Sequence, residues 1–96
     1  MKNRRKEIYK AALQKWGIEN QLQMLGEESL ELSLATRRLY RKGPSEETIN
    51  EISGEIADTE IMIEQTKMML EYWSVRKRVG YIKRSKIARL ANRLKG

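Results

Sequence analysis

The sequence contains no cysteine and no histidine. Without these side chains the chain forms no disulfide and no cysteine- or histidine-ligated zinc site, and it has neither a thiol nucleophile nor an imidazole base. Any metal ion must therefore be a hard cation held by oxygen ligands, which favours Mg²⁺ or Mn²⁺. This reasoning directs the search for a functional site to the carboxylates.

Residues that favour strands are also scarce. Phenylalanine is absent, valine is rare and Pro44 is the only proline, whereas Leu, Met, Ile, Glu, Lys and Arg dominate. Because no stretch alternates apolar with polar residues, the sequence predicts an all-α fold. No apolar run approaches the roughly 20 residues of a membrane span, and no signal-peptide core follows the N-terminus, so we expect a cytoplasmic protein without a membrane partner.

The 96 residues are predicted to form one all-α domain, residues 1–96, built from four helices. The clearest boundary is the Lys-Gly-Pro-Ser sequence of residues 42–45, because Gly and Pro end a helix and Ser begins one. Weaker breaks lie around Gly17 and Ser74. The predicted helices run from about Asn3 to Trp16, from Asn20 to Arg41, from Ser45 to Trp73 and from Val75 to Leu94.

Two of these helices carry apolar residues on two sides. On the third helix, at about 100° per residue, one stripe consists of Ile49, Ile52, Ile56, Ile63 and Leu70, and a second of Met62, Met69 and Trp73. On the second helix, Leu25, Leu32, Ala35 and Leu39 lie opposite Leu30 and Leu34. Because two apolar faces need two sets of neighbours, we expect a four-helix bundle-like protomer that assembles into a homodimer or homotetramer.

The formal charge of +7 is unevenly distributed along the chain. From Val75 to Gly96 there is no acid, and the basic residues are Arg76, Lys77, Arg78, Lys83, Arg84, Lys86, Arg89, Arg93 and Lys95. The middle of the chain, from Glu27 to Glu71, is instead rich in acids. We therefore predict a basic C-terminal helix at about 75–95 joined to an acidic body, and a polyanionic partner.

Two pairs of acids lie where the periodicity predicts apolar faces. Glu28 lies on the apolar face of the second helix and Glu31 borders it, while Glu55 and Asp58 share the stripe of Met62. Each pair has i, i+3 spacing, so two such helices packed antiparallel would bring all four carboxylates together. One such pair alone is typical of a solvated helix face. Two pairs on neighbouring apolar stripes favour a site for one or two divalent cations, because unpaired buried carboxylates are costly.

The acidic pairs lie in Glu-Glu-Ser-Leu-Glu-Leu, residues 27–32, and in Glu-Ile-Ala-Asp, residues 55–58. Together with Lys-Trp-Gly at 15–17, these motifs resemble the signature of the MazG-like all-α nucleoside triphosphate pyrophosphohydrolases, especially small phage-type members. That superfamily includes the dimeric dUTPases and the dCTP pyrophosphatases. The resemblance covers about residues 13–65. It implies Mg²⁺-dependent hydrolysis of a (deoxy)nucleoside triphosphate to monophosphate and pyrophosphate, a nucleotide-pool housekeeping activity, with Glu28, Glu31, Glu55 and Asp58 as catalytic metal ligands.

Five further residues are candidates for contacts with the substrate: Trp16, Gln21, Arg84, Lys86 and Arg89. By resemblance, Lys86 matches a family lysine that contacts substrate phosphates, with Arg84 and Arg89 as alternatives and a solvated basic face as the other interpretation. Gln21 lies one heptad before the first acidic pair, which indicates either a polar contact to the substrate or a hydrogen-bonded core glutamine. Trp16 is able to stack on a base, although an aromatic residue near a helix end is more often part of a core.

Two other classes of protein remain open from the sequence. The basic C-terminal segment is also typical of a helical nucleic-acid-binding protein without catalytic activity, although no recognition motif accompanies the charge. A structural helical bundle, in which the acids hold no metal, is the third interpretation. The paired acids on apolar faces favour the enzyme over both alternatives.

Overall fold

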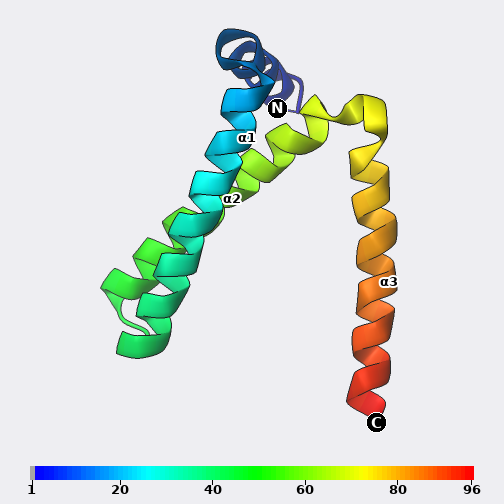
Figure 1. Ribbon diagram of the computed structural model, residues 1–96. Coiled ribbons are helices and arrows are strands. Elements are labelled where there is room, and N and C mark those ends of the chain that lie inside the picture. Colours follow the sequence, from blue (N-terminus) through cyan, green and yellow to red (C-terminus); the bar gives the residue numbers. More distant parts are fainter. Residues whose placement is uncertain (1) are drawn as a thin grey trace. The chain divides into compact units, whose positions relative to one another are not determined.

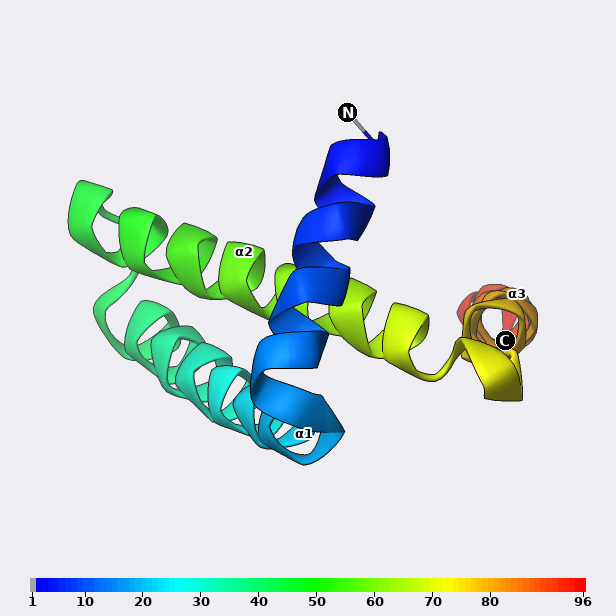
Figure 2. The same ribbon diagram turned by 90° about the horizontal axis from the view of Figure 1, so that it is seen from above.

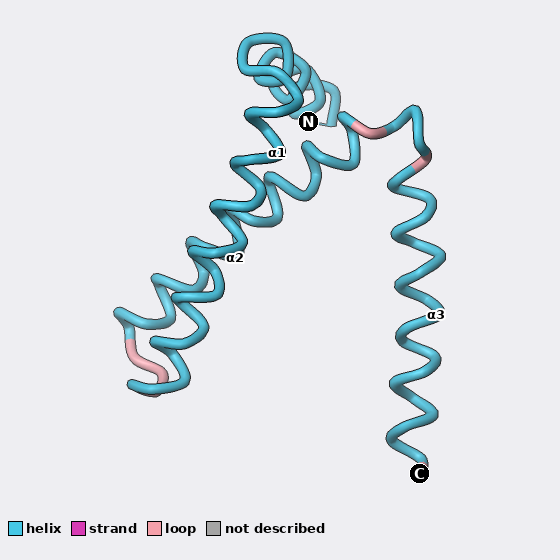
Figure 3. The backbone as a smooth tube through the Cα atoms, viewed as in Figure 1, coloured by secondary structure: helices cyan, strands magenta, loops and turns pink. Residues whose placement is uncertain are grey.

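The computed structural model describes residues 2–96, which are almost entirely helical and contain no strand. The elements are α1 (Lys2–Lys42), α2 (Glu46–Met69), the 3₁₀ helix η1 (Glu71–Trp73) and α3 (Val75–Lys95). The all-α prediction is confirmed. Two compact units divide the chain, one ending at Thr66 and the other running from Lys67 to Gly96, and each is described by itself. Within residues 2–96, loops are confined to the α1–α2 connection and the two sides of η1 (Figures 1 and 3).

The long helix α1 consists of two helical segments that meet at Gly17. Its φ of 83° and ψ of 161° lie outside the helical region, in a conformation that is open almost only to glycine. The break predicted around Gly17 is therefore confirmed. Beyond this residue α1 runs alongside α2, whereas the segment before it crosses α2 (Figure 2). The change of direction gives α1 two different contacts with the same partner helix.

Replacing Gly17 with alanine is expected to lower the free energy of unfolding by about 1–3 kcal/mol, because a Cβ strains this backbone conformation. No heavy atom lies within 4 Å of the added Cβ, so the cost is conformational rather than steric. Gly26→Ala is the matched control, since Gly26 is helical with equally open surroundings. It should stabilise the helix by about 0.5–1 kcal/mol. Urea denaturation measures both changes, and equal effects would contradict the assigned role of Gly17.

The segment of α1 before Gly17 is attached to α2 through Glu64. The hydroxyl of Tyr9 donates a hydrogen bond to Oε2 of Glu64 at 2.9 Å, and Nη1 of Arg5 lies 3.3 Å from Oε1. Burial, followed by the hydrogen bond and the negative charge of Glu64, raises the pKa of Tyr9. The phenol therefore stays protonated and able to donate.

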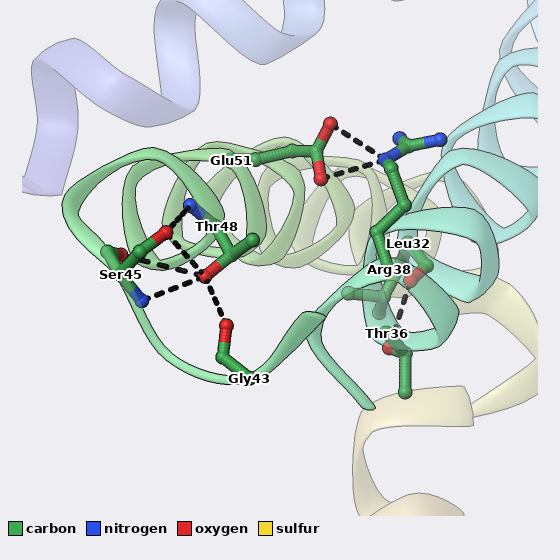
Figure 4. Close-up of polar contacts among 7 residues, drawn as sticks. All are labelled: Leu32, Thr36, Arg38, Gly43, Ser45, Thr48 and Glu51. Atoms are coloured by element: carbon green, nitrogen blue, oxygen red, sulfur yellow. Dashed lines mark hydrogen bonds and ion pairs between the residues drawn. The ribbon is translucent and has the colours of Figure 1, made fainter. Parts of the chain in front are cut away.

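The turn between α1 and α2 is defined by Gly43, Ser45 and Thr48 (Figure 4). Gly43 has a φ of 78° and donates its N–H to the Leu39 carbonyl at 2.8 Å, which ends α1. Ser45 Oγ accepts the Thr48 N–H at 3.1 Å, and Thr48 Oγ1 accepts the Ser45 N–H at 2.9 Å. This reciprocal pair satisfies two N–H groups at the start of α2, as in a capping box, with threonine in place of glutamate. The boundary predicted at residues 42–45 is confirmed.

One charged pair joins the two helices close to this turn. Nε of Arg38 lies 2.8 Å from both carboxylate oxygens of Glu51 (Figure 4). The hydrogen bond from Arg38 lowers the pKa of Glu51 below its ordinary value. Glu51 therefore contributes stability at pH values above its unfolded pKa, and that contribution is lost as the pH falls through the folded pKa.

Glu51→Gln is accordingly expected to lower the thermal midpoint at neutral pH. The difference from the original protein should shrink as the pH falls below the ordinary glutamate pKa of about 4.3. The effect should be small, because both side chains are partly exposed. Thermal melts from pH 7 to pH 3 measure it. A difference that persists unchanged to pH 3 would contradict the linkage.

The core of the first unit is small. Among residues 3–96, Ala35 and Met62 are the buried hydrophobic residues, and Gln21, Thr48, Thr59 and Gln65 are buried polar residues. One predicted apolar face of each helix is therefore covered by the partner helix. The other predicted face is left exposed within residues 3–96, and it includes Leu30, Leu34, Ile49, Ile56 and Ile63.

The end of α2 differs from the prediction. The α-helix ends at Met69 rather than at Trp73, and residues 71–73 form η1. Trp73 thus leaves the predicted stripe of Met62, and its side chain is exposed. Ser74 then adopts a φ of 55° and its N–H donates to the Glu71 carbonyl at 2.9 Å, which separates η1 from α3.

The helix α3 is exposed along its length from Tyr81 to Lys95. Near its start, Nε of Arg78 donates to the Trp73 carbonyl oxygen at 2.8 Å. The basic helix predicted at about 75–95 is confirmed as an element. Within the described residues, no helix combines the length and apolar character that crossing a membrane requires.

Candidate metal centre

The acidic residues are positioned by the antiparallel pairing of α1 and α2. The hydroxyl of Thr59 donates to the Glu55 carbonyl at 2.8 Å and lies 3.3 Å from the Glu28 carbonyl. Thr59 is buried, so this hydroxyl lies at the contact between the two helices. This contact places Glu28 of α1 next to Glu55 of α2. The ion pair of Arg38 with Glu51 fixes the same register between the two helices nearer the turn.

Three of the predicted ligands come together. Glu28, Glu55 and Asp58 each offer a carboxylate oxygen, and these oxygens all lie within 4.8 Å of one another. Glu28 and Glu55 are half-buried and Asp58 is exposed. Glu31 is exposed and does not belong to this group, although its charge acts on Glu28.

The three carboxylates carry like charges that repel one another. Burial raises the pKa of Glu28, and repulsion by Asp58 and Glu55 raises it further. Oε2 of Glu55 is shielded from solvent and has no hydrogen-bond partner among the described residues. The ion pairs among residues 3–96 join Arg5 to Glu64 and Arg38 to Glu51, and neither pair involves these three acids.

A small hollow of about 170 Å³ opens at the acids and is lined by Glu28, Asp58, Ile61 and Met62. A larger hollow of about 350 Å³ lies beside it, and Met62 lines both. Trp16 and Gln21, the two substrate-contact candidates on α1, line the larger hollow. Gln21 is buried, as both of its interpretations require, and no hydrogen bond joins its side chain to another described residue.

Two residues of this region were not predicted as functional residues. Thr59 and Gln65 are buried polar residues of α2, and Gln65 lines the larger hollow. Both follow the stripe of Glu55 and Met62 at helical spacing, Thr59 four residues after Glu55 and Gln65 three after Met62. A polar residue on an apolar stripe was the signal that identified the acids, and the same signal identifies these two.

The three basic candidates, Arg84, Lys86 and Arg89, lie on α3 in the second unit. Their side chains are exposed. Each is therefore open to solvent and to a partner.

Comparison of the chain with protein-family models, with curated proteins and with solved structures finds no match. The residues of the site and their chemistry are therefore the basis on which a function is assigned.

Proposed function

We propose that the chain is a Mg²⁺-dependent hydrolase that cleaves a (deoxy)nucleoside triphosphate to the monophosphate and pyrophosphate. One observation carries the proposal: three carboxylates converge on one point, and a shielded oxygen of Glu55 lacks a partner there. A divalent cation would supply that partner and turn the mutual repulsion of the acids into attraction. The resemblance of residues 13–65 to the MazG-like enzymes supports the same chemistry.

The donor set fits magnesium or manganese. Glu28, Glu55 and Asp58 provide only oxygen ligands, which hard cations prefer. Glu31, whose charge acts on Glu28, is the fourth ligand of the proposal. The exposed position of Asp58 leaves one side of the group open to solvent and to a phosphate chain. When bound, the cation would neutralise phosphate charge and lower the pKa of a bound water.

The protein's own residues then have separate tasks. Thr59 holds the backbones of Glu28 and Glu55 in register, so that their side chains approach from opposite helices. Since the chain has no histidine, a carboxylate must orient or deprotonate the attacking water. Burial and the neighbouring acids raise the pKa of Glu28 in the metal-free protein, and a bound cation would counter that effect because positive charge favours the ionised carboxylate.

The proposal is tested by incubating the protein with Mg²⁺ and a panel of normal and modified nucleoside triphosphates and measuring pyrophosphate. Release that stops in EDTA and in Glu28→Gln supports it. Glu27→Gln is the matched control, since Glu27 is the exposed neighbour outside the group of three. No release from any triphosphate would remove the proposal.

We also propose that the chain works as a homo-oligomer. The buried apolar core among residues 3–96 consists of Ala35 and Met62, which is little for a folded unit of this size. The exposed apolar face carries Leu34 on α1 and Ile56 on α2, among others, and a second copy brings an apolar face of the same kind. Covering these residues would supply the missing hydrophobic stabilisation.

Binding of nucleic acid is the second candidate function, and the unbroken basic character of α3 favours it. From Val75 to Gly96 the chain has nine basic residues and no acid, and the helix is exposed from Tyr81 onward. Phosphate contacts from such a helix release counterions, so affinity for DNA or RNA should fall steeply with salt. Anisotropy of a labelled duplex between about 50 and 200 mM salt tests this, and an affinity that does not change with salt would exclude it.

A further inference from the structure

The larger hollow beside the acids has the lining of a site for a flat, hydrogen-bonding ring. Its volume is about 350 Å³, at the lower end of the range for small-molecule pockets. Residues from both helices line it: Ala12, Trp16, Asn20, Gln21, Met24, Met62 and Gln65. Apolar and aromatic walls with a few amides are typical of sites that bind small ligands.

The two buried amides of this hollow have unused hydrogen-bonding groups. Gln65 is 8% exposed, and its Nε2 donates one hydrogen bond, to Sδ of Met62 at 3.4 Å. Its Oε1 has no hydrogen-bond partner among the described residues. Gln21 is 4% exposed, and neither end of its amide is paired with another described residue. These amide atoms keep contact with solvent, since among the described residues Oε2 of Glu55 is the side-chain atom that is both fully shielded and unpartnered. A ligand in the hollow can therefore reach them, and its hydrogen bonds would replace those to water.

The walls suit an aromatic ligand. Trp16 is 54% exposed, and Nζ of Lys15 lies 5.3 Å from the centroid of its ring. Met24 and Met62 add thioether groups, which pack well against aromatic rings. A planar ring that lies on these residues would direct its edge toward the two glutamines.

The hollow and the acids belong to one continuous region of the first unit. Met62 lines both hollows, and Gln21 precedes Glu28 by seven residues, or about 10 Å along a helix. A nucleotide spans such a distance, with its base at one end and its phosphates at the other. The two hollows together therefore match the two ends of a nucleotide.

We propose that the larger hollow binds the base of a nucleotide, and that Gln65 with Gln21 selects a base that carries an exocyclic amino group. The placement of the phosphates at the acids rests on the proposed function, whereas the selection of the base does not. Gln65 Oε1 accepts a hydrogen bond from an amino group, and Gln21 donates to the neighbouring ring nitrogen. Cytosine and adenine have this arrangement. Uracil and hypoxanthine carry a carbonyl oxygen in place of the amino group. Two hydrogen-bond acceptors, this oxygen and Oε1 of Gln65, would then face each other with no donor between them.

Two pairs of nucleotides differ mainly in this exocyclic amino group. Deoxycytidine monophosphate has the amino group and deoxyuridine monophosphate lacks it, and deoxyadenosine monophosphate and deoxyinosine monophosphate differ in the same way. Calorimetric titration of each into the protein in EDTA measures affinity without metal or turnover. Repulsion between phosphate and acids is the same within a pair, so the ratio reports the base alone. We expect the amino member of each pair to bind at least about 10-fold more tightly.

The variant Gln65→Met keeps the length of the side chain and removes its acceptor. It should bring the ratio within each pair close to one, and Gln21→Met should weaken binding of both amino nucleotides. Gln23→Met is the matched control, since Gln23 is exposed on α1 and does not line the hollow. Circular dichroism checks that each variant folds. If Gln65→Met does not fold, the binding ratios of the original protein alone test the base selection.

Two outcomes separate this inference from the proposed function. Preference for amino bases without pyrophosphate release supports the base site and contradicts the hydrolase. Pyrophosphate release with equal binding within each pair supports the hydrolase and overturns the base selection. Absence of binding by any of the four nucleotides, or an unchanged ratio in Gln65→Met, also overturns it.

Discussion

Replacing Glu55 with glutamine is expected to abolish most hydrolysis while making the metal-free protein more stable. The substitution removes a carboxylate whose Oε2 is shielded and unpartnered, and it relieves repulsion with Glu28 and Asp58. It also removes a ligand of the proposed cation. Because metal ions contribute several kcal/mol to transition-state stabilisation and each 1.36 kcal/mol is tenfold in rate, pyrophosphate release should fall at least about 100-fold.

The two readouts move in opposite directions, which distinguishes a ligand from a structural residue. Thermal melts in EDTA should show a higher midpoint for Glu55→Gln than for the original protein, and added Mg²⁺ should raise the midpoint of the original protein alone. Glu60→Gln is the control, since Glu60 is an exposed acid of the same helix outside the group of three. A variant that loses activity and stability together would indicate that Glu55 serves the fold.

Replacing Ile63 with aspartate is expected to dissociate the proposed homo-oligomer. Ile63 is 40% exposed in the single chain, on the uncovered face of α2. Burying an unpaired carboxylate at an interface costs several kcal/mol, and each 1.4 kcal/mol is tenfold in affinity. The dissociation constant should therefore rise at least about 100-fold, with a lower thermal midpoint at micromolar concentration.

Analytical ultracentrifugation of both forms measures this change. Asn50→Asp is the matched control, because it adds the same charge to an exposed position of the same helix, away from the stripe of Ile49, Ile56 and Ile63. An original protein that sediments as a monomer would contradict the oligomer, as would an Ile63→Asp variant with unchanged mass.

Periodicity and turn chemistry were sufficient for most of the fold. The connection at residues 42–45 and the break at Gly17 follow from local rules for glycine, proline and serine. The early end of α2 was missed because no glycine or proline marks it, and Ser74 takes its left-handed conformation without such a signal. The segment before Gly17 crosses α2 through Tyr9 and Glu64, and long-range contacts of this kind have no periodicity.

The sequence predicted only part of the site, because helical spacing does not specify how two helices are aligned with each other. Helical spacing placed Glu28, Glu55 and Asp58 on facing stripes, and these three do converge. Glu31 stays exposed outside this group, although it follows Glu28 by the same three-residue step that separates Asp58 from Glu55. Which acids meet depends on the register between helices, and Thr59 and Arg38 set it through contacts that spacing alone does not specify.

The most direct test of the proposed metal centre is a titration of the protein with Mn²⁺ followed by electron paramagnetic resonance. We expect saturable binding by the original protein, weakened at least about 10-fold in Glu28→Gln and in Glu55→Gln, with Glu27→Gln unaffected. Mn²⁺ that stays free in solution, or that binds equally well after both substitutions, would contradict the assignment of these acids as ligands.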